Sequence, residues 1–244
     1  MKKVIFLLMV SVLFSCAKKE HADTLVLFME KEDGVEPYQT RMIVTKDFVR
    51  IDDGEGDKDF VLFNRNKKIV HSVNAGEKTI MAVHEKKLKP GQKFEPPFKL
   101  IHSNKEMPVM KDAPTIEGEE AKHYQLITND QVCYDVIAIK GLMPNVVTAL
   151  TEFHKHMATD SRVTFNNLPA DMHNACDMTA TTFKPARQFE FGFPIQEWGK
   201  REYSRSLVDY NINYKADAKL FVLPEGYKNY TVTELREGKV NFAD

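Results

Sequence analysis

The sequence lacks the short motifs that mark most enzyme families. Its 244 residues contain no HExxH, no GxSxG, no Walker phosphate-binding loop and no CxxC. These absences argue against zinc peptidases, α/β-hydrolases, P-loop nucleotide hydrolases and thioredoxin-like redox proteins. Serine, histidine and aspartate occur throughout the chain, but no local signature singles out a catalytic triad. We therefore expect no catalytic site, no metal site and no cofactor.

The chain also lacks a large charge of either sign. It has 34 Lys and Arg against 35 Asp and Glu, which gives a net charge of −1 with neutral histidines. Nucleic-acid-binding domains carry a strongly basic surface, so this balance predicts no nucleic-acid partner. Beyond the N-terminus, no apolar run approaches the about 20 residues that a membrane span needs. We expect the remainder of the chain to lie in the aqueous periplasm.

The N-terminus carries the most informative pattern. Two lysines at positions 2 and 3 precede an apolar run from Val4 to Phe14. This arrangement is typical of a secretory signal peptide and is too short to span a bilayer. The sequence LFSC, Leu13–Cys16, resembles the bacterial lipobox, in which the cysteine is acylated and becomes the first residue after cleavage. A plain signal peptide with a chance cysteine is the alternative.

The lipobox resemblance implies a leader at residues 1–15, lipidation of Cys16 and a flexible tether at residues 16–23. Two or more acyl chains would make the anchor stable, because each buried CH₂ contributes about 0.8 kcal/mol. Loss of the two leader lysines would leave a net charge of −3. The residue after the cysteine is Ala17 and not the aspartate of the enteric retention rule. We therefore expect the protein in the outer membrane, facing the periplasm.

Cys133 and Cys176 are the remaining cysteines once Cys16 carries lipid. An exported chain with one such pair is expected to oxidise it. The bond would close a loop of 43 positions and would stabilise the fold by about 4 kcal/mol on the chain-entropy estimate. The alternative is two free thiols that lie too far apart to bond.

Short strands rich in Val, Ile and Phe, separated by Gly, Asp and Asn turns, indicate an antiparallel meander from residue 24 to residue 86. A proline-rich connection follows at residues 87–120, and a hairpin turns at Asp130. The stretch from Pro144 has helical spacing, with Val146, Leu150, Phe153 and Met157 on one face. A second short helix should carry Cys176. We expect strands again at residues 181–195, with Phe189, Phe191 and Phe193 on one face, and at 203–214, with Val208, Tyr210, Ile212 and Tyr214 on one face. Residues 219–232 should end the sheet with a strand, a Pro-Glu-Gly turn and a final edge strand.

These elements predict a mainly β fold with a few helices. We expect residues 24–244 to form one domain, a curved antiparallel sheet or incomplete barrel wrapped around one or two helices. The alternation of the strands and the amphipathic helix are the observations behind this expectation.

Five acidic residues lie between Asp52 and Asp59. No EF-hand register starting at Asp52 or Asp53 puts glycine sixth and glutamate twelfth, as calcium binding would require. We therefore expect a solvated acidic hairpin, with a weak calcium site as the alternative. His154 and His156 lie two apart on the predicted helix and are expected at its surface, not in a metal site. His71 and His84, on strands, are expected to be hydrogen-bonded polar residues.

The segment FVLPEGYK resembles the closing segment of the LolA/LolB-like superfamily of envelope proteins. Phe221, Pro224, Gly226 and Tyr227 match its Phe-x-x-Pro-x-Gly-Tyr pattern. A narrower group of uncharacterised proteobacterial lipoproteins resembles the chain at Val49–Arg65 and in the CYD of Cys133. The superfamily resemblance implies an incomplete barrel whose interior holds acyl chains. The sequence shows no counterpart of the membrane-inserting leucine loop of the receptor in that superfamily. The pair Cys133 and Cys176 is not a feature that the resemblance implies.

Two functions follow from this resemblance and from the composition. The first is a lipid-anchored protein that binds an acyl chain or another apolar ligand in a concave sheet, lined by some of its 16 Phe and 8 Tyr residues. Those aromatic residues could instead simply fill a core. The second is a structural or interaction lipoprotein that docks on another envelope complex and binds no ligand.

The lipobox generates a direct test. Cys16→Ala should leave the protein without acyl chains, so it should remain a precursor or leave the membrane fraction. The measurement is membrane fractionation with electrophoretic mobility. A variant that fractionates and migrates like the wild type would show that Cys16 is not lipidated.

Overall fold

The computed structural model describes residues 23–55, 58–87, 94–108, 115–169, 172–199 and 203–241. The expected leader, Cys16 and all of the expected tether except Asp23 lie outside these residues. In the part of the chain that is described, no helix is both long and apolar enough to span a membrane.

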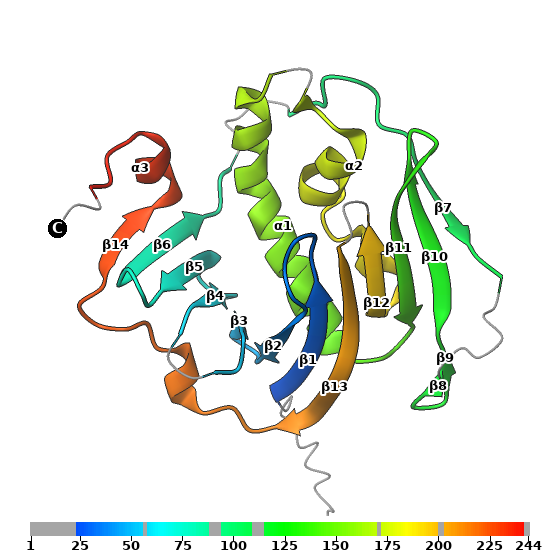
Figure 1. The fold of residues 1–244 in the computed structure, drawn as a ribbon, viewed down its shortest axis with the longest axis horizontal. Helices are drawn as coiled ribbons and strands as arrows, with labels where there is room; N and C mark the ends of the chain where they lie inside the picture. The colour runs from blue at the N-terminus through cyan, green and yellow to red at the C-terminus, as the bar shows by residue number, and fades with distance from the viewer. Residues whose placement is uncertain are drawn as a thin grey trace, which may run out of the picture.

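One curved sheet of twelve strands forms the body of the protein (Figure 1). Its order is β14-β6-β5-β4-β3-β2-β1-β13-β12-β11-β10-β7, and the sheet does not close into a barrel. All neighbouring strands are antiparallel except β14 and β6, which are parallel. The strands are β1 (Asp23–Lys31), β2 (Tyr38–Val44), β3 (Phe48–Asp52), β4 (Phe60–Asn64), β5 (Ile69–Asn74), β6 (Thr79–His84), β7 (His102–Glu106), β10 (Lys122–Thr128), β11 (Gln131–Ile139), β12 (Phe193–Gly199), β13 (Ser204–Tyr214) and β14 (Lys228–Thr231), with a separate small hairpin of β8 (Thr115–Ile116) and β9 (Glu119–Glu120).

The mainly β class with a curved antiparallel sheet confirms the coarse prediction from the sequence. The meander from β1 to β6 is the one that the alternating pattern indicated, because apolar side chains two residues apart face the same side of a strand. The expected hairpin at Asp130 joins β10 to β11. In the described part of the proline-rich connection, the regular elements are β7 and the small β8–β9 hairpin.

The long helix α1 (Pro144–Asn167) packs against one face of the sheet. Val146 and Leu150 are fully buried in the main core, and Phe153 and Met157 pack against it, which confirms the predicted apolar face. The helix contacts β2, β3, β6 and β12, which lie far apart in the strand order. One helix can touch strands so widely separated because the sheet bends around it, as Figure 1 shows.

The opposite face of β3–β6 has a second apolar cluster. Its buried members are Phe60, Leu62, Val73 and Ile80. Residues 215–227 connect β13 to β14 and cover this cluster; we call them the crossing segment. They pass from one side of the meander to the other, because β13 pairs with β1 and β14 pairs with β6. Phe48 of β3 stacks on Phe221 of this segment, with ring centroids 5.2 Å apart. The central strands are therefore covered on both faces, by α1 and by the crossing segment.

The prediction of a strand at residues 181–195 is wrong over most of this range. A π-helical turn occupies Thr179–Phe183, a 3-10 helix occupies Arg187–Phe191, and β12 begins only at Phe193. The phenylalanines recur every second residue, but Phe191 belongs to the helix and stacks on Tyr124, 4.1 Å between ring centroids. Arg187 is buried and donates hydrogen bonds to strand carbonyls, and these long-range bonds are invisible in a local pattern.

Two further details differ at the C-terminal side. A register shift opposite Leu27 and Phe28 interrupts the alternation of β13. As a result Leu207 and Tyr210 both pack against the main core, whereas Val208 is 54% exposed. The strand expected to begin at residue 219 is instead a 3-10 helix, Ala218–Phe221, and the last described helix, α3 (Val232–Arg236), had no prediction.

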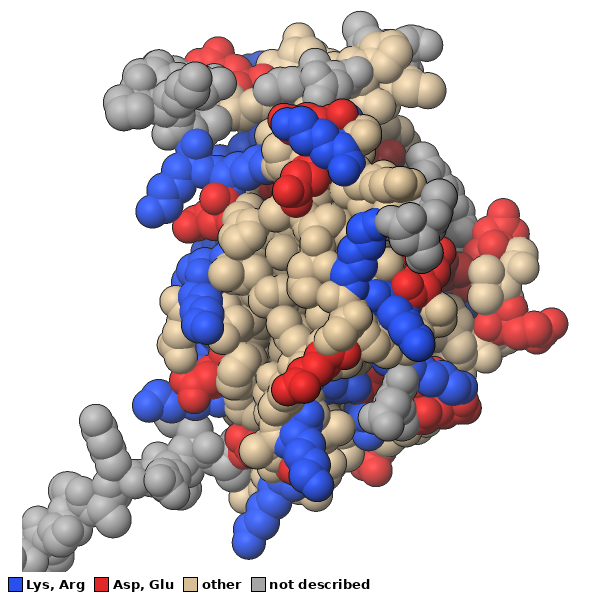
Figure 2. Space-filling view, turned by 90° about the vertical axis from the view of Figure 1, so that its left-hand side faces the viewer, with Lys and Arg blue, Asp and Glu red and all other residues tan. Residues whose placement is uncertain are grey.

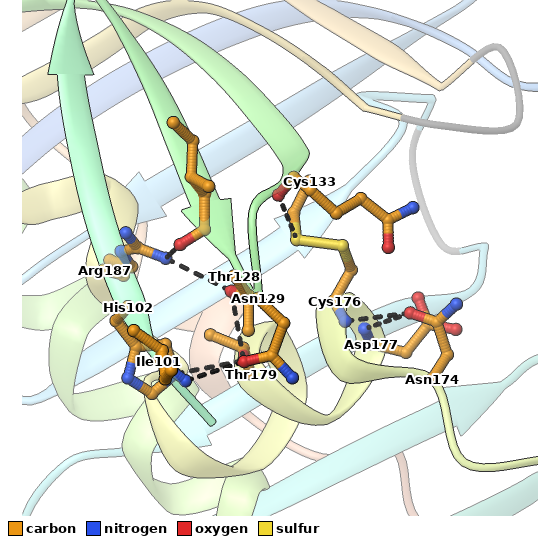
Figure 3. Close-up of a disulfide and its surroundings, with 12 residues drawn as sticks. Ile101, His102, Thr128, Asn129, Cys133, Asn174, Cys176, Asp177, Thr179 and Arg187 are labelled. Atoms are coloured by element: carbon orange, nitrogen blue, oxygen red, sulfur yellow. Dashed lines mark hydrogen bonds between the residues drawn. A yellow bond between two sulfur atoms is a disulfide. The ribbon is translucent and has the colours of Figure 1, made fainter. Parts of the chain in front are cut away.

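Cys133 of β11 and Cys176 of α2 (Ala175–Met178) form a disulfide, with Cα atoms 5.2 Å apart (Figure 3). The short helix α2 is the one that the sequence placed around Cys176. Asn174 caps it, since its side chain accepts hydrogen bonds from the backbone N–H groups of Cys176 and Asp177. A four-residue helix has little stability of its own, so the disulfide and the cap hold it against the sheet.

The disulfide generates a prediction about stability. Replacing both Cys133 and Cys176 by alanine should lower the free energy of unfolding by about 4 kcal/mol, because the unfolded chain regains the freedom of the open loop. Urea unfolding measures the loss. As a control, thiol labelling of the denatured, unreduced wild type should find neither cysteine free. Two reactive thiols in protein purified without reductant would contradict the pairing.

Candidate functional site

Of the two histidines predicted at the helix surface, His156 is buried and His154 is half-buried. His156 is 4% exposed, and its Nε2 donates to the carbonyl oxygen of Val83 at 3.0 Å. His154 lies against the rings of Phe153 and Phe189. Burial, with a smaller contribution from the charge of Arg205, lowers the pKa of His154 to about 4. His156 lies in the interior and His154 packs between aromatic rings, so the surface prediction was wrong, because apolar packing covers more of α1 than one stripe.

The strand histidines also differ from the expectation. His84 is exposed. The Nδ1 atom of His71 is buried and has no hydrogen-bond partner in the described part of the chain. Burial, followed by the charge of His84, lowers the pKa of His71. The described residues contain no group of three or more His, Cys, Asp or Glu side chains that could hold a metal ion.

One histidine–carboxylate pair was missed. His123 Nε2 lies 2.7 Å from Asp135 Oδ1, and the imidazole packs against the Trp198 ring. A hydrolase of the serine or cysteine type needs a hydroxyl or thiol bonded to such an imidazole. No described serine, threonine or cysteine makes that bond, so the pair has the geometry of a structural contact between β10 and β11.

The acidic hairpin is only partly solvated. Asp53, Glu55 and Asp59 are exposed, as expected, but Asp52 is buried. Its carboxylate accepts hydrogen bonds from Arg41 Nε at 2.7 Å and Nη2 at 2.8 Å and from Arg50 Nε at 2.5 Å. Asp52 is therefore an ion-pair centre and not a hairpin residue.

Arg50 connects this centre to the crossing segment. It is 4% exposed, and its Nη1 donates to the carbonyl oxygen of Leu220 at 2.7 Å. The guanidinium also lies 3.8 Å above the ring of Phe60, a cation–π contact. The sequence holds a signal for this arrangement: in FVRID, Arg50 and Asp52 share one face of a strand whose other face is apolar.

A groove opens beside Arg50, between β3–β5 and the crossing segment, with a volume of about 540 Å³. We call it the sheet groove. Apolar and aromatic side chains make up most of its walls: Phe60, Val73, Ala75, Leu220, Val222, Leu223, Pro224 and Tyr227. Pro224 and Tyr227 belong to the FVLPEGYK stretch, whose Phe221 packs underneath and whose Gly226 adopts a φ of 75° in the turn. This volume and lining match those of small-ligand sites.

Four charged side chains reach the sheet groove: Arg50, Lys58, Lys219 and Glu225. Asp52 between Arg41 and Arg50 leaves one net positive charge in that cluster. Lys58 contacts Glu55 and lies 4.0 Å from Asp53. Lys219 forms no ion pair with any described residue. After the ion pairs with Asp52 and Glu55 are counted, two positive charges remain at the groove. The exposed carboxylate of Glu225 is the one negative charge that faces them among the described residues that line the groove.

Figure 2 shows the end of the molecule that carries β14, β6 and α3. Uncharged side chains occupy the middle of this surface, and Lys, Arg, Asp and Glu side chains lie around them. In Figure 1 the crossing segment runs below this end, at the lower left.

Comparison with known proteins identifies no family. No protein-family model matches the chain, and no curated protein matches it. Among solved structures, an uncharacterised conserved protein from Thermus thermophilus is similar with a TM-score of 0.41 and 8% identity, covering 86% of this chain and 91% of that one. Two structures of PNGF-II have TM-scores of 0.39 and 0.40 and identities of 11% and 8%.

The chain spans about a third of PNGF-II, covering 32% and 33% of the two structures. Similarities this distant supply no argument about function. The resemblance to the LolA/LolB-like superfamily stays a prediction.

The Asp52 ion-pair centre makes a prediction about pH. Burial alone would raise the pKa of Asp52, but hydrogen bonds from Arg41 and Arg50 outweigh it and lower the pKa. The ionised carboxylate therefore stabilises the fold above the ordinary aspartate pKa of about 3.9. Asp52→Asn should lower the free energy of unfolding by about 3 kcal/mol at neutral pH, because Arg50 is left buried without its counter-charge.

The difference in free energy of unfolding between the wild type and Asp52→Asn should become smaller as the pH falls below about 4. In that range Asp52 of the wild type becomes protonated, as the pH passes through its lowered pKa, and loses the same interaction. Urea unfolding across pH 3–7 provides the measurement. The neighbouring exposed Asp53→Asn is the matched control and should change stability by less than about 0.5 kcal/mol. Equal effects of the two substitutions would contradict the assignment of Asp52 as the centre.

Proposed function

We propose that this protein is a lipid-anchored envelope protein that binds an apolar acid, such as a fatty acid, in the sheet groove. The observation that carries the proposal is the groove itself, in which apolar walls meet an unpaired lysine. The proposed anchor is Cys16, and the proposed location is the periplasmic side of the outer membrane, as Ala17 suggests.

The proposal differs in one respect from the LolA/LolB-like expectation. In that superfamily the acyl chains lie inside an incomplete barrel, against the concave face of the sheet. Here α1 packs against the face around which the sheet bends, and Val146 and Leu150 fill the core there. The sheet groove on the other face offers the space, so we place the ligand between β3–β5 and the crossing segment.

Apolar walls supply most of the binding energy in such a site. Each CH₂ group removed from water contributes about 0.8 kcal/mol, so several methylene groups against Phe60, Val73 and Leu223 give useful affinity. The groove volume of about 540 Å³ accommodates an acyl chain bent over these side chains. Part of this energy is offset by ordering of the chain.

The charged end of the ligand is placed by Lys219. Its ammonium group has no described carboxylate partner, and the 3-10 helix that carries it begins at an Asp217 cap. Arg50 is held by Asp52 and by the carbonyl of Leu220, so it forms a fixed positive wall and not a mobile partner. A carboxylate at Lys219 would thus gain a charge-assisted contact at the edge of an apolar groove.

The test is binding of a fluorescent fatty acid to the purified full chain. Lys219→Glu should raise Kd by about tenfold or more, because it replaces attraction by repulsion at the groove edge. Val222→Asp should have a similar effect, and since Val222 is 64% exposed the variant should still fold. A fatty alcohol of the same length should bind more weakly to the wild type and be insensitive to Lys219→Glu.

Matched controls carry the same chemical changes outside the groove. Lys215→Glu lies on the crossing segment, and Val35→Asp lies in a turn where the side chain is 50% exposed. Both should bind like the wild type. Absence of displaceable binding, or equal losses in variants and controls, would contradict the proposal and favour the docking lipoprotein that needs no ligand.

A further inference from the structure

We propose that a second groove, along α1, binds an extended anion that carries several phosphate or carboxylate groups. We call it the helix groove. It consists of two hollows of about 560 and 300 Å³ that share Lys155, Phe183 and Pro185. Its sides are α1, the chain that follows β6, and the π-helical turn at Thr179–Phe183.

The helix groove collects cations that have no partners. Lys87, Lys155, Arg162 and Lys184 line it and form no ion pair with any described residue. Two carboxylates, Glu85 and Glu190, line it as well. Arg187 also lines the groove, but its guanidinium is used in hydrogen bonds to Asn104 and to the carbonyl oxygen of Ile127. The other four cations without an ion pair exceed the two carboxylates by two.

Lys86, also at the groove, has a carboxylate partner. Lys86 lies 3.2 Å from the Oδ1 atom of Asp160, and Arg236 of α3 binds the same carboxylate at 2.6 Å. Asp160 is therefore shared by two cations, so this cluster keeps one net positive charge, and four further cations at the groove have no ion pair with any described residue. Convergence of unpaired cations in a hollow is the arrangement that raises the local concentration of anions.

The floor of the helix groove strengthens this effect. Ala158 is 1% exposed and Thr182 is 3% exposed, and Phe183 stacks on Phe94 with ring centroids 5.1 Å apart. Walls of low polarity reduce the screening of the nearby charges, so an anion in the groove is attracted more strongly than on a flat surface.

The spacing of the cations indicates an extended anion. Lys155 and Arg162 are seven residues apart on α1, which corresponds to about 10 Å along the helix axis. The two side chains thus offer separate contact points along the groove. A chain with several charged groups can use both, and each further contact adds to the affinity without a second loss of translational freedom.

The position of the groove indicates an anion from solution. Asn145 at the start of α1 donates to Thr24 at the start of β1, whereas Thr159 accepts from the backbone N–H of Lys86. Those two points are fourteen residues or about 21 Å apart along the helix. In Figure 1 the start of β1 and the upper part of α1 accordingly lie at opposite ends. The proposed anchor at Cys16, on which this placement rests, would put the membrane beside residue 23 and remote from the groove.

The experiment is titration calorimetry of the full chain in detergent with inorganic polyphosphate at low salt. The triple variant Lys155→Gln, Arg162→Gln, Lys184→Gln should raise Kd by about tenfold or more. Binding by the wild type should weaken as salt is added, because the contacts are electrostatic. The triple control Lys67→Gln, Lys105→Gln, Lys140→Gln loses the same charge at exposed sites outside both grooves and should bind like the wild type.

Three results would overturn the proposal. They are no binding of polyphosphate, equal losses in the two triple variants, and equal affinity for orthophosphate and polyphosphate. Tight binding to phosphatidylglycerol vesicles without binding of polyphosphate would also overturn it, since the anion would then come from a lipid headgroup. The residues and the probe differ from those of the sheet groove, so either proposal can fail while the other stands.

Discussion

The guanidinium of Arg50 links strands β3 and β4 to the crossing segment, and the sheet groove lies between these parts. It bonds to Asp52 beside it on β3, to the carbonyl oxygen of Leu220 in the crossing segment and to the face of Phe60 on β4. Buried charge is costly unless it is paired and hydrogen-bonded, and here a carboxylate and a carbonyl meet that condition. The crossing segment is thereby fixed above the sheet, and the sheet groove exists in the space that remains beside this contact.

A wide sheet with apolar side chains on both faces needs two covers. On one face α1 buries the main core, and the sheet bends around it. On the other, the crossing segment covers β3–β6 only in part, with Phe221 and Tyr227 against the second cluster. Incomplete cover leaves apolar surface open to solvent, and such surface in a small domain often marks a ligand site. The proposed binding of an apolar acid follows from this asymmetry between the two covers.

Local patterns predicted the local structure well and the long-range structure poorly. The meander, the apolar face of α1 and the short helix at Cys176 follow from alternation, helical spacing and turn residues. The 3-10 helix at Arg187–Phe191, the shift in β13 and the burial of His156 are set by contacts with distant strands, which no short window contains. Arg50 and Asp52 are intermediate: their shared face is readable in FVRID, but the partner Leu220 lies 170 residues away.

The most direct test of the central claim is to locate a bound fatty acid in the protein. A photoactivatable fatty acid would be crosslinked to the full chain and the labelled peptides identified by mass spectrometry. The account predicts label on the crossing segment or on β4 and β5, lost in the presence of excess unlabelled fatty acid. Label confined to α1 or to the strands β10–β12, or label that excess fatty acid does not displace, would contradict it.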